Sequence, residues 1–149
     1  MSLSADEESL LRRALDLARA ARASGNPPFG SLLVDAEGRV LAEDTNTTIA
    51  DADITAHPEL KLARWAAREV PAQNRAGVTM YTSCQPCPMC AEAISRSGIG
   101  RVVFALSNEQ LEEVKPPGTP SPRHPWTADG PHLHPESAAP LDGYYAAGP

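Results

Sequence analysis

The chain has 149 residues, of which 42% are apolar and 21% charged, the size and composition of a single globular domain with a buried core. No apolar run approaches the length of about eighteen residues that a transmembrane helix needs, and the first residues lack the basic start and apolar stretch of a secretory signal. The formal net charge of −6 argues against a partner bound through its phosphates, so nucleic acid is not an expected partner.

The first part of the chain predicts a helix followed by a hairpin. Ser4 begins the helix with Glu7 three residues later, the spacing of a capping box, and apolar residues then recur at helical spacing as far as Ala21. A Gly-Asn-Pro-Pro segment ends this helix. Residues 31–34 and 39–42 predict two strands, because the Asp-Ala-Glu-Gly segment between them is typical of a hairpin turn.

The middle of the chain alternates between helices and strands after a polar segment over residues 43–53. Helices packed on both faces of a mixed sheet bury such a pattern of elements, which predicts an α/β fold. The elements expected here are a helix over 56–69, a strand over 78–82, a helix from about 88 to 97, a strand over 101–105 and a short helix that Ser107 or Asn108 caps and that ends at Val114.

The last third of the chain has a different composition. Residues 115–149 hold nine of the fifteen prolines, and neither a helical nor a strand period is visible there. We therefore divide the chain into a core over 1–114 and a Pro-rich C-terminal arm over 115–149. The arm is either ordered by its contacts or partly disordered, and the sequence leaves both open.

Three cysteines, Cys84, Cys87 and Cys90, fall within seven residues. No second cysteine cluster is present, so a disulfide framework is not expected, and a cytoplasmic protein with a metal-binding or reactive cluster is favoured. Cys87 and Cys90 form a C-x-x-C pair at the expected start of a helix, where exposed N–H groups and the helix dipole favour the thiolate that binds metals.

A second short segment, His57-Pro58-Glu59, also lies at an expected helix start. If the N-termini of the two helices face each other, they close a His/Cys/Cys site. Three protein ligands leave the fourth position of zinc open to water, whose pKa the metal lowers toward ~7. Glu59 lies two residues from His57, where a carboxylate is well placed to take the proton from that water.

The H-x-E and P-C-x-x-C pair resembles the signature of the cytidine deaminase-like superfamily of zinc deaminases. Residues 28–30, Pro-Phe-Gly, and residues 82–90, Thr-Ser-Cys-Gln-Pro-Cys-Pro-Met-Cys, look most like the bacterial guanine deaminase and nucleoside deaminase branch. The resemblance covers most of residues 4–114. It implies a three-layer α/β/α fold with a central mixed sheet of about five strands, and a homodimer or higher oligomer.

The resemblance also implies a role for individual residues. His57, Cys87 and Cys90 would bind zinc, and Glu59 would carry protons as the catalytic residue. Substrate contacts would come from the side chain of Asn46, eleven residues before His57, from Phe29 as a wall of the base pocket, and from the backbone around Ser83 and Cys87.

This sequence departs from the pattern of the branch at three points. Pro58 stands between the histidine and the glutamate, where Ala, Gly or Val is usual. Ser31 stands where Ala is common. Guanine deaminases of this branch carry a further acid after the last core strand, but the matching position lies near Gly118, and the nearest candidates are Glu112 and Glu113. The last departure argues against guanine itself as the substrate but not against deamination.

These features predict a zinc-dependent aminohydrolase that removes an exocyclic amine, as ammonia, from the amidine carbon of a small N-heterocycle. A purine-type, guanine-like free base or its nucleoside is the leading substrate. A cytosine-type or other amino-heterocycle is the alternative, followed by tRNA adenosine. A catalytically silent subunit of the same fold and a purely structural zinc module are the rivals outside enzymes.

Several residues also have simpler interpretations. The two cysteines of the C-x-x-C pair can be buried thiols or a redox pair, and Cys84 can be a competing ligand or a small apolar residue at a strand end. Asn46 lies in a polar segment where asparagine is common in turns, and Phe29 can belong to the core. His132 and His134 are expected to be solvated, with a weak second metal site as the alternative.

Aromatic residues are unusual in so polar an arm, and Trp126, Tyr144 and Tyr145 must either pack somewhere or stay exposed. One hypothesis is that the arm folds over an active site, its own or that of a neighbouring subunit, with Tyr145 as the ring that covers the substrate. A purely structural arm is equally compatible with the sequence.

Overall fold

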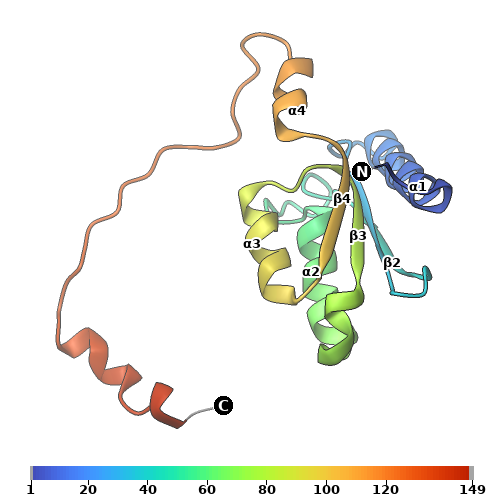
Figure 1. Cartoon of the computed structure of the whole chain (residues 1–149). Coiled ribbons are helices and arrows are strands. Elements are labelled where there is room, and N and C mark those ends of the chain that lie inside the picture. The colour runs from blue at the N-terminus through green and yellow to red at the C-terminus, as the bar shows by residue number, and fades with distance from the viewer. Residues whose placement is uncertain (1, 148–149) are drawn as a thin grey trace. The chain divides into compact units, whose positions relative to one another are not determined.

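A computed structural model describes residues 2–147. The chain divides into two units, residues 1–116 and 117–149, and each is described by itself. The first unit contains, in chain order, α1 (Ala5–Ala23), β1 (Gly30–Val34), β2 (Val40–Thr45), α2 (Pro58–Glu69), the 3₁₀ helix η1 (Ala72–Gly77), β3 (Thr79–Cys84), α3 (Pro88–Ser97), β4 (Arg101–Leu106) and α4 (Asn108–Val114) (Figure 1).

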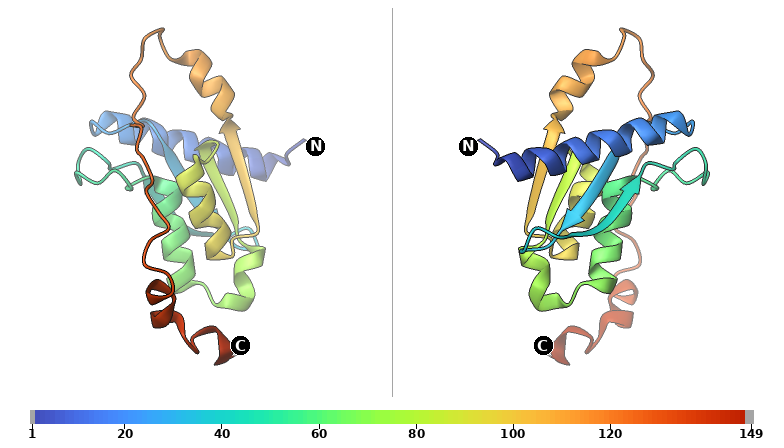
Figure 2. Two further views of the ribbon diagram at one scale, coloured as in Figure 1. Left: turned by 90° about the vertical axis from the view of Figure 1, so that its left-hand side faces the viewer. Right: turned by 90° about the vertical axis from the view of Figure 1, so that its right-hand side faces the viewer.

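The four strands form one mixed sheet in the order β2-β1-β3-β4. β1 runs antiparallel to β2 and to β3, whereas β3 and β4 are parallel. The two views of Figure 2 show α2 and α3 in front of one face of the sheet and α1 in front of the other. The prediction of a three-layer α/β fold is therefore confirmed.

The sheet has four strands within residues 2–147, slightly fewer than the expected five or so. The chain that follows β4 forms the seven-residue helix α4. It then continues into a segment that is rich in proline, which lacks the N–H group that a sheet ladder needs. A fifth strand therefore does not form in the described part of the chain.

Strand alternation sends the side chains of β1 and β3 to two separate apolar cores. Leu33 and Met80 pack with α2 and α3 on one face, whereas Leu32 and Tyr81 pack with α1 on the other. Both cores are closed by small and branched side chains of the helices. These are Leu62, Ala63, Ala66 and Ile94 on the first face, and Ala14 and Leu17 on the second.

The predicted capping box at the start of α1 is confirmed. Ser4 Oγ accepts a hydrogen bond from the Glu7 N–H at 3.1 Å, and Glu7 Oε2 accepts one from the Ser4 N–H at 2.9 Å. Two backbone donors that a helix start leaves without partners are thereby satisfied. The other carboxylate oxygen of Glu7 lies 2.6 Å from Arg101, so the cap also ties α1 to β4.

β2 continues through Thr45, three residues farther than expected, although Glu43 and Asp44 are charged. An edge strand tolerates such residues when their charges find partners. Arg13 of α1 lies 2.6 Å from Glu43, and Lys61 of α2 lies 2.8 Å from Asp44. Because these cations come from distant helices, local sequence did not indicate that the strand extends this far.

Gly30 begins β1 where α1 crosses the sheet most closely. A Cβ placed on Gly30 would overlap the Leu17 side chain and lie 2.6 Å from the Ala18 backbone nitrogen. We expect Gly30→Ala to force α1 away and to lower the unfolding free energy by about 1–3 kcal/mol or more. Thermal unfolding measures the effect. Gly130→Ala is the control, because its Cβ would meet nothing within 4 Å. Equal melting temperatures for the two variants would contradict this packing.

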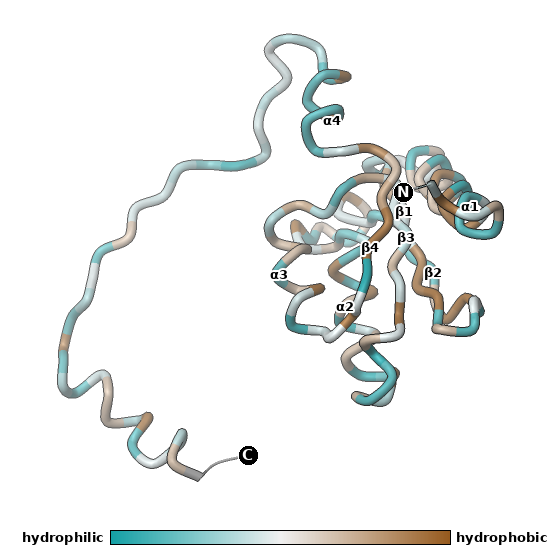
Figure 3. Tube along the Cα trace, viewed as in Figure 1, coloured by the Kyte–Doolittle hydropathy of each residue, from teal (hydrophilic) through white to brown (hydrophobic). Residues whose placement is uncertain are grey.

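The second unit contains two short 3₁₀ helices, η2 (Glu136–Leu141) and η3 (Tyr145–Ala147). The hydropathy colouring of Figure 3 shows its few apolar residues scattered among polar ones. Tyr144 and Tyr145 meet edge to face with ring centroids 4.8 Å apart, and both rings are exposed, as is that of Trp126. No helix within residues 2–147 is long and apolar enough to cross a membrane.

Candidate active site

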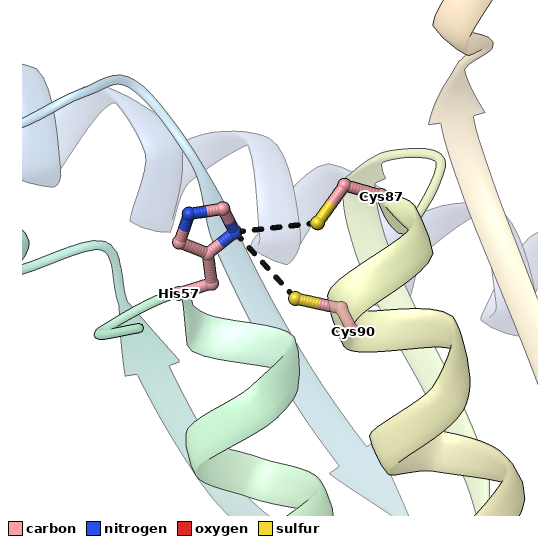
Figure 4. A group of neighbouring side chains, drawn as sticks. All are labelled: His57, Cys87 and Cys90. Carbon is pink, nitrogen blue, oxygen red and sulfur yellow. Dashed lines mark hydrogen bonds between the residues drawn. The ribbon is translucent and has the colours of Figure 1, made fainter. Parts of the chain in front are cut away.

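Two helix starts on the same face of the sheet bring the sequence-predicted ligands together. His57 is the N-cap of α2 and Cys87 is the N-cap of α3, each followed by a proline at the first helical position. Proline suits this position because its missing N–H has no partner there in any helix. Cys90 lies in the first turn of α3 and is fully buried. One ligand atom from each of these three residues lies within 4.8 Å of the other two (Figure 4).

The spacing of these atoms fits a zinc ion. His57 Nδ1 lies 3.7 Å from Cys87 Sγ and 3.5 Å from Cys90 Sγ. Zn–S bonds of about 2.3 Å and Zn–N bonds of about 2.0 Å place nitrogen and sulfur about 3.5 Å apart around a tetrahedral ion. Nδ1, rather than Nε2, faces both sulfurs (Figure 4) and is therefore the ring atom that would ligate. The soft thiolates and the imidazole form a donor set that zinc prefers.

Protons are distributed unevenly over the three ligands. The pKa of Cys87 is lowered to about 3, first because Cys90 donates a hydrogen bond to its sulfur and then because His57 does. The pKa of Cys90 is raised, first by that same hydrogen bond and then by burial. The contact with Cys87 also raises the pKa of His57. The Cys87 thiolate is thus ready to ligate, whereas Cys90 and a protonated His57 must lose protons when a metal binds.

Glu59 lies in the first turn of α2, buried beside the metal centre with 5% of its surface exposed. Its Oε1 accepts a hydrogen bond from the Thr82 hydroxyl at 3.2 Å, and its Oε2 lies 3.9 Å from Cys90 Sγ. Burial raises the pKa of the carboxyl group above its usual value. A raised pKa brings a carboxyl group closer to the range in which it can accept a proton and return it, as acid–base catalysis requires.

Phe29 directly precedes β1 and Asn46 directly follows β2. The two residues are neighbours, since the Asn46 N–H donates to the Phe29 carbonyl at 3.0 Å. The Thr48 N–H donates to Asn46 Oδ1 at 2.9 Å. Since a backbone N–H can only donate, this bond fixes which end of the Asn46 amide is oxygen. Asn46 begins the segment that leads from β2 to α2. The next residue, Thr47, donates its N–H to the carbonyl of Ala56, the residue before His57, and so holds the start of this segment next to its end.

Phe29 is half-buried, and Asn46 is buried with 3% of its surface exposed. Within the described part of the chain, Phe29 belongs to neither apolar core.

The other sequence-predicted residues have different surroundings. The Ser83 hydroxyl accepts a hydrogen bond from the Gly30 N–H at 3.1 Å, so its side chain supports β1. Cys84 is the last residue of β3 and is buried, and it lies outside the group of ligand atoms. Tyr145 belongs to the second unit and is exposed. Glu112 and Glu113 are exposed on α4, and Glu112 pairs with Lys115 at 2.6 Å.

Sequence reasoning missed residues that hold the site in place. Thr82 contacts Glu59, and although it begins the 82–90 segment, nothing in the sequence assigned it a role beside Glu59. Lys61 binds both Asp44 and the Thr47 hydroxyl, at 2.8 and 2.9 Å, and thus fixes the loop that carries Asn46. Asn108 at the start of α4 donates its N–H to Gln85 at 3.0 Å and so holds the segment before Cys87. No short motif marks such contacts.

Comparison with known proteins places the chain among deaminases. The family model of the cytidine and deoxycytidylate deaminase zinc-binding region matches residues 4–106. A Schizosaccharomyces pombe protein described as a probable cytosine deaminase is 31% identical over 98% of this chain and 96% of its own length. A tRNA-specific adenosine deaminase of Haemophilus influenzae is 38% identical over 68% of this chain and 59% of its own length.

A third relative is similar in both sequence and structure. Guanine deaminase of Bacillus subtilis is 38% identical over 73% of this chain and 70% of its own length. The X-ray structure of that protein aligns with a TM-score of 0.78 and 28% identity, covering 95% of this chain and 94% of the other.

The family match extends from the cap of α1 to the end of β4. It therefore includes both short motifs, the four strands and the helices α1, α2 and α3. The ligand geometry fits the zinc ion that the family's description names. The chain belongs to the family defined by the cytidine and deoxycytidylate deaminase zinc-binding region.

Proposed function

We propose that this protein is a zinc-dependent hydrolytic deaminase that releases ammonia from a small N-heterocycle, in first place a purine-type free base or its nucleoside. The observation that carries this proposal is the buried Glu59 carboxylate beside a centre to which residues 2–147 contribute three protein ligands. A structural zinc site would need a fourth protein ligand. Burying a charged carboxylate is unfavourable, and a catalytically silent subunit would have no need of it.

His57, Cys87 and Cys90 would hold a zinc ion, which would supply the Lewis-acid chemistry that makes water a nucleophile at neutral pH. Glu59 accepts a proton from the attacking water at Oε2, the carboxylate oxygen on the metal side. It passes this proton to the ring nitrogen, then takes the remaining proton of that water from the hydroxyl group now on the ring carbon and delivers it to the departing amine, as the C–N bond breaks and the ring carbonyl forms. The balance is water plus amino-heterocycle giving the ring carbonyl and ammonia.

Substrate orientation is assigned to Asn46, Phe29 and Ser83. With Oδ1 bound to Thr48, the Asn46 side chain keeps its Nδ2 donors for an acceptor on the ring. Phe29, tied to Asn46 through the backbone, supplies an apolar wall. Ser83 contributes its backbone, because its hydroxyl is already bound to Gly30.

The relatives and the charge support the proposed order of substrate classes. Guanine deaminase of Bacillus subtilis is similar over most of both chains, which favours a purine-type base. A cytosine-type ring is the second candidate, because the probable cytosine deaminase matches nearly the whole chain. tRNA comes third because the chain is acidic overall and its Pro-rich arm lacks a basic helix. We expect a homodimer that works in the cytoplasm.

Ammonia release from a panel of compounds tests this function. Zinc-loaded protein is incubated with free purine and pyrimidine bases, their nucleosides, other amino-heterocycles and a tRNA anticodon stem-loop. Release from a purine base or nucleoside, absent in a Glu59→Gln control, is the expected result. Release from cytosine alone would replace the substrate assignment. No release from any compound by protein with a full zinc content would favour the silent-subunit alternative.

The C-terminal arm offers a further test of the site. If the arm covers a substrate through Tyr145, deletion of residues 140–149 should reduce kcat/KM while the melting temperature of the core stays unchanged. Tyr145→Ala should reproduce about a threefold to tenfold loss, the effect expected from one aromatic contact. Tyr144→Ala is the control, because the two rings share one exposed cluster. Unchanged kinetics in the deletion would show that the arm has a structural role only.

A further inference from the structure

Two buried hydroxyl groups lie behind Glu59 on the same face of the sheet. Ser31 of β1 and Thr82 of β3 are direct partners in the antiparallel ladder, and neither has any exposed surface. Their neighbours on this face, Leu33 and Met80, belong to the apolar core. Polar groups in such a place are unfavourable unless they are hydrogen-bonded. The structure provides these bonds as two hydrogen bonds in series, which end at the Glu59 carboxylate.

The direction of these two hydrogen bonds follows from the chemistry of the groups that they join. A carboxylate can only accept, so the Thr82 hydroxyl donates its single proton to Glu59 Oε1, at 3.2 Å. Thr82 Oγ1 is then left as an acceptor, and the Ser31 hydroxyl donates to it at 2.7 Å. Each hydroxyl proton is committed in one direction, toward Glu59. Because β-sheet hydrogen bonds hold the two strands together, the positions of the Ser31 and Thr82 side chains are fixed.

The two carboxylate oxygens of Glu59 consequently have different surroundings. Oε1 is held by Thr82 on the sheet side, whereas Oε2 lies 3.9 Å from Cys90 Sγ on the side of the metal centre. Rotation of the carboxylate would break the bond to Thr82 and leave a buried hydroxyl unpaired. We propose that Thr82, supported by Ser31, is a positioning residue that keeps Glu59 Oε2 directed at the metal centre. Its effect on turnover rests on the deaminase function proposed above.

Thr82→Val removes the hydroxyl but keeps the shape of the side chain. We expect kcat to fall by about 10- to 100-fold, as for the loss of other outer-shell partners, with the zinc content unchanged. KM should stay within about twofold, because Thr82 holds the catalytic group and not the substrate. Thr82→Ser, which retains the hydroxyl, should recover most of the turnover. A wild-type kcat in Thr82→Val would overturn the proposal.

A double variant separates positioning from stability. Thr82→Val alone leaves the Ser31 hydroxyl without its acceptor, which lowers stability by itself. Ser31→Ala combined with Thr82→Val removes both hydroxyls, so the melting temperature should return toward the wild-type value. The kcat of the double variant should remain low. If kcat recovers together with the melting temperature, the hydroxyl pair is merely structural and the proposal is wrong.

Crystal structures of the zinc-loaded wild type and of Thr82→Val provide a readout that needs no turnover. We expect one Glu59 conformer in the wild type and a rotated or divided carboxylate in the variant. An unchanged Glu59 conformer would overturn the positioning role. Absence of ammonia release from the wild-type protein counts against the proposed function alone, because the crystallographic comparison still decides the position of the carboxylate.

Discussion

Glu59→Gln should nearly abolish ammonia release, by at least the ~10²–10⁴-fold that general acid–base catalysis contributes. Glutamine has the size of glutamate, and its amide oxygen can accept the hydrogen bond that Thr82 now donates to Oε1. An amide cannot take up a proton near neutral pH, so the transfers assigned to Oε2 stop. The fold and the three zinc ligands are untouched. Steady-state kinetics and zinc analysis on the same sample measure both effects.

Glu92→Gln is a suitable matched control for this variant. Glu92 is exposed on α3, pairs with Arg96 one turn later and is not one of the grouped ligand residues. Its replacement should leave kcat and KM unchanged, because an exposed ion pair of this kind contributes little to stability. A Glu59→Gln protein that retains full zinc and turns over at a near-normal rate would remove Glu59 from the mechanism. Loss of zinc in that variant would instead assign Glu59 a role in holding the metal.

Cys90→Ala should release the zinc ion and abolish activity with it. Cys90 is fully buried in the first turn of α3, and its sulfur lies next to His57 Nδ1. This sulfur is one of the three protein ligand atoms in the group. Its loss should weaken zinc binding by more than the ~10–100-fold that the loss of an outer-shell partner costs. Zinc content after dialysis and competition with a chelator measure the change.

The third cysteine provides the control for Cys90. Cys84→Ala changes a buried thiol three residues before Cys87, and this thiol lies outside the ligand group. Zinc stoichiometry should stay at the wild-type value in Cys84→Ala, with at most a modest loss of stability from the small cavity. Zinc loss in Cys84→Ala but not in Cys90→Ala would reverse the ligand assignment and identify Cys84 as the second sulfur ligand.

Zinc binding should also depend on pH in a defined direction. The raised pKa of Cys90 and the raised pKa of His57 mean that both groups bind protons more tightly than usual, and zinc competes with those protons. Apparent zinc affinity is therefore expected to fall as the pH is lowered, and zinc addition should acidify a weakly buffered solution. Calorimetry in buffers of different ionisation enthalpy counts the released protons. Zinc affinity that is independent of pH would contradict this assignment of protons.

Local sequence was sufficient to predict the elements and the metal ligands. Helix starts depend on neighbouring residues, so Ser4, Pro58 and Pro88 marked three helices within a residue or two. A C-x-x-C spacing places two sulfurs on one helical turn whatever the rest of the chain does. The H-x-E spacing likewise keeps His57 and Glu59 together. These are short-range relations, and both the family resemblance and the predicted chemistry are based on them.

Only the tertiary structure decided what surrounds those groups. Ser31 and Thr82 are 51 residues apart and meet because β1 pairs with β3 in one particular register. The extension of β2 needed Arg13 and Lys61 from two different helices. Hydrogen bonds and ion pairs between distant segments depend on how strands align, and a shift of one residue sends every side chain to the other face. For this reason the sequence alone predicted which residues carry the proposed chemistry, whereas the fold determined which residues surround them.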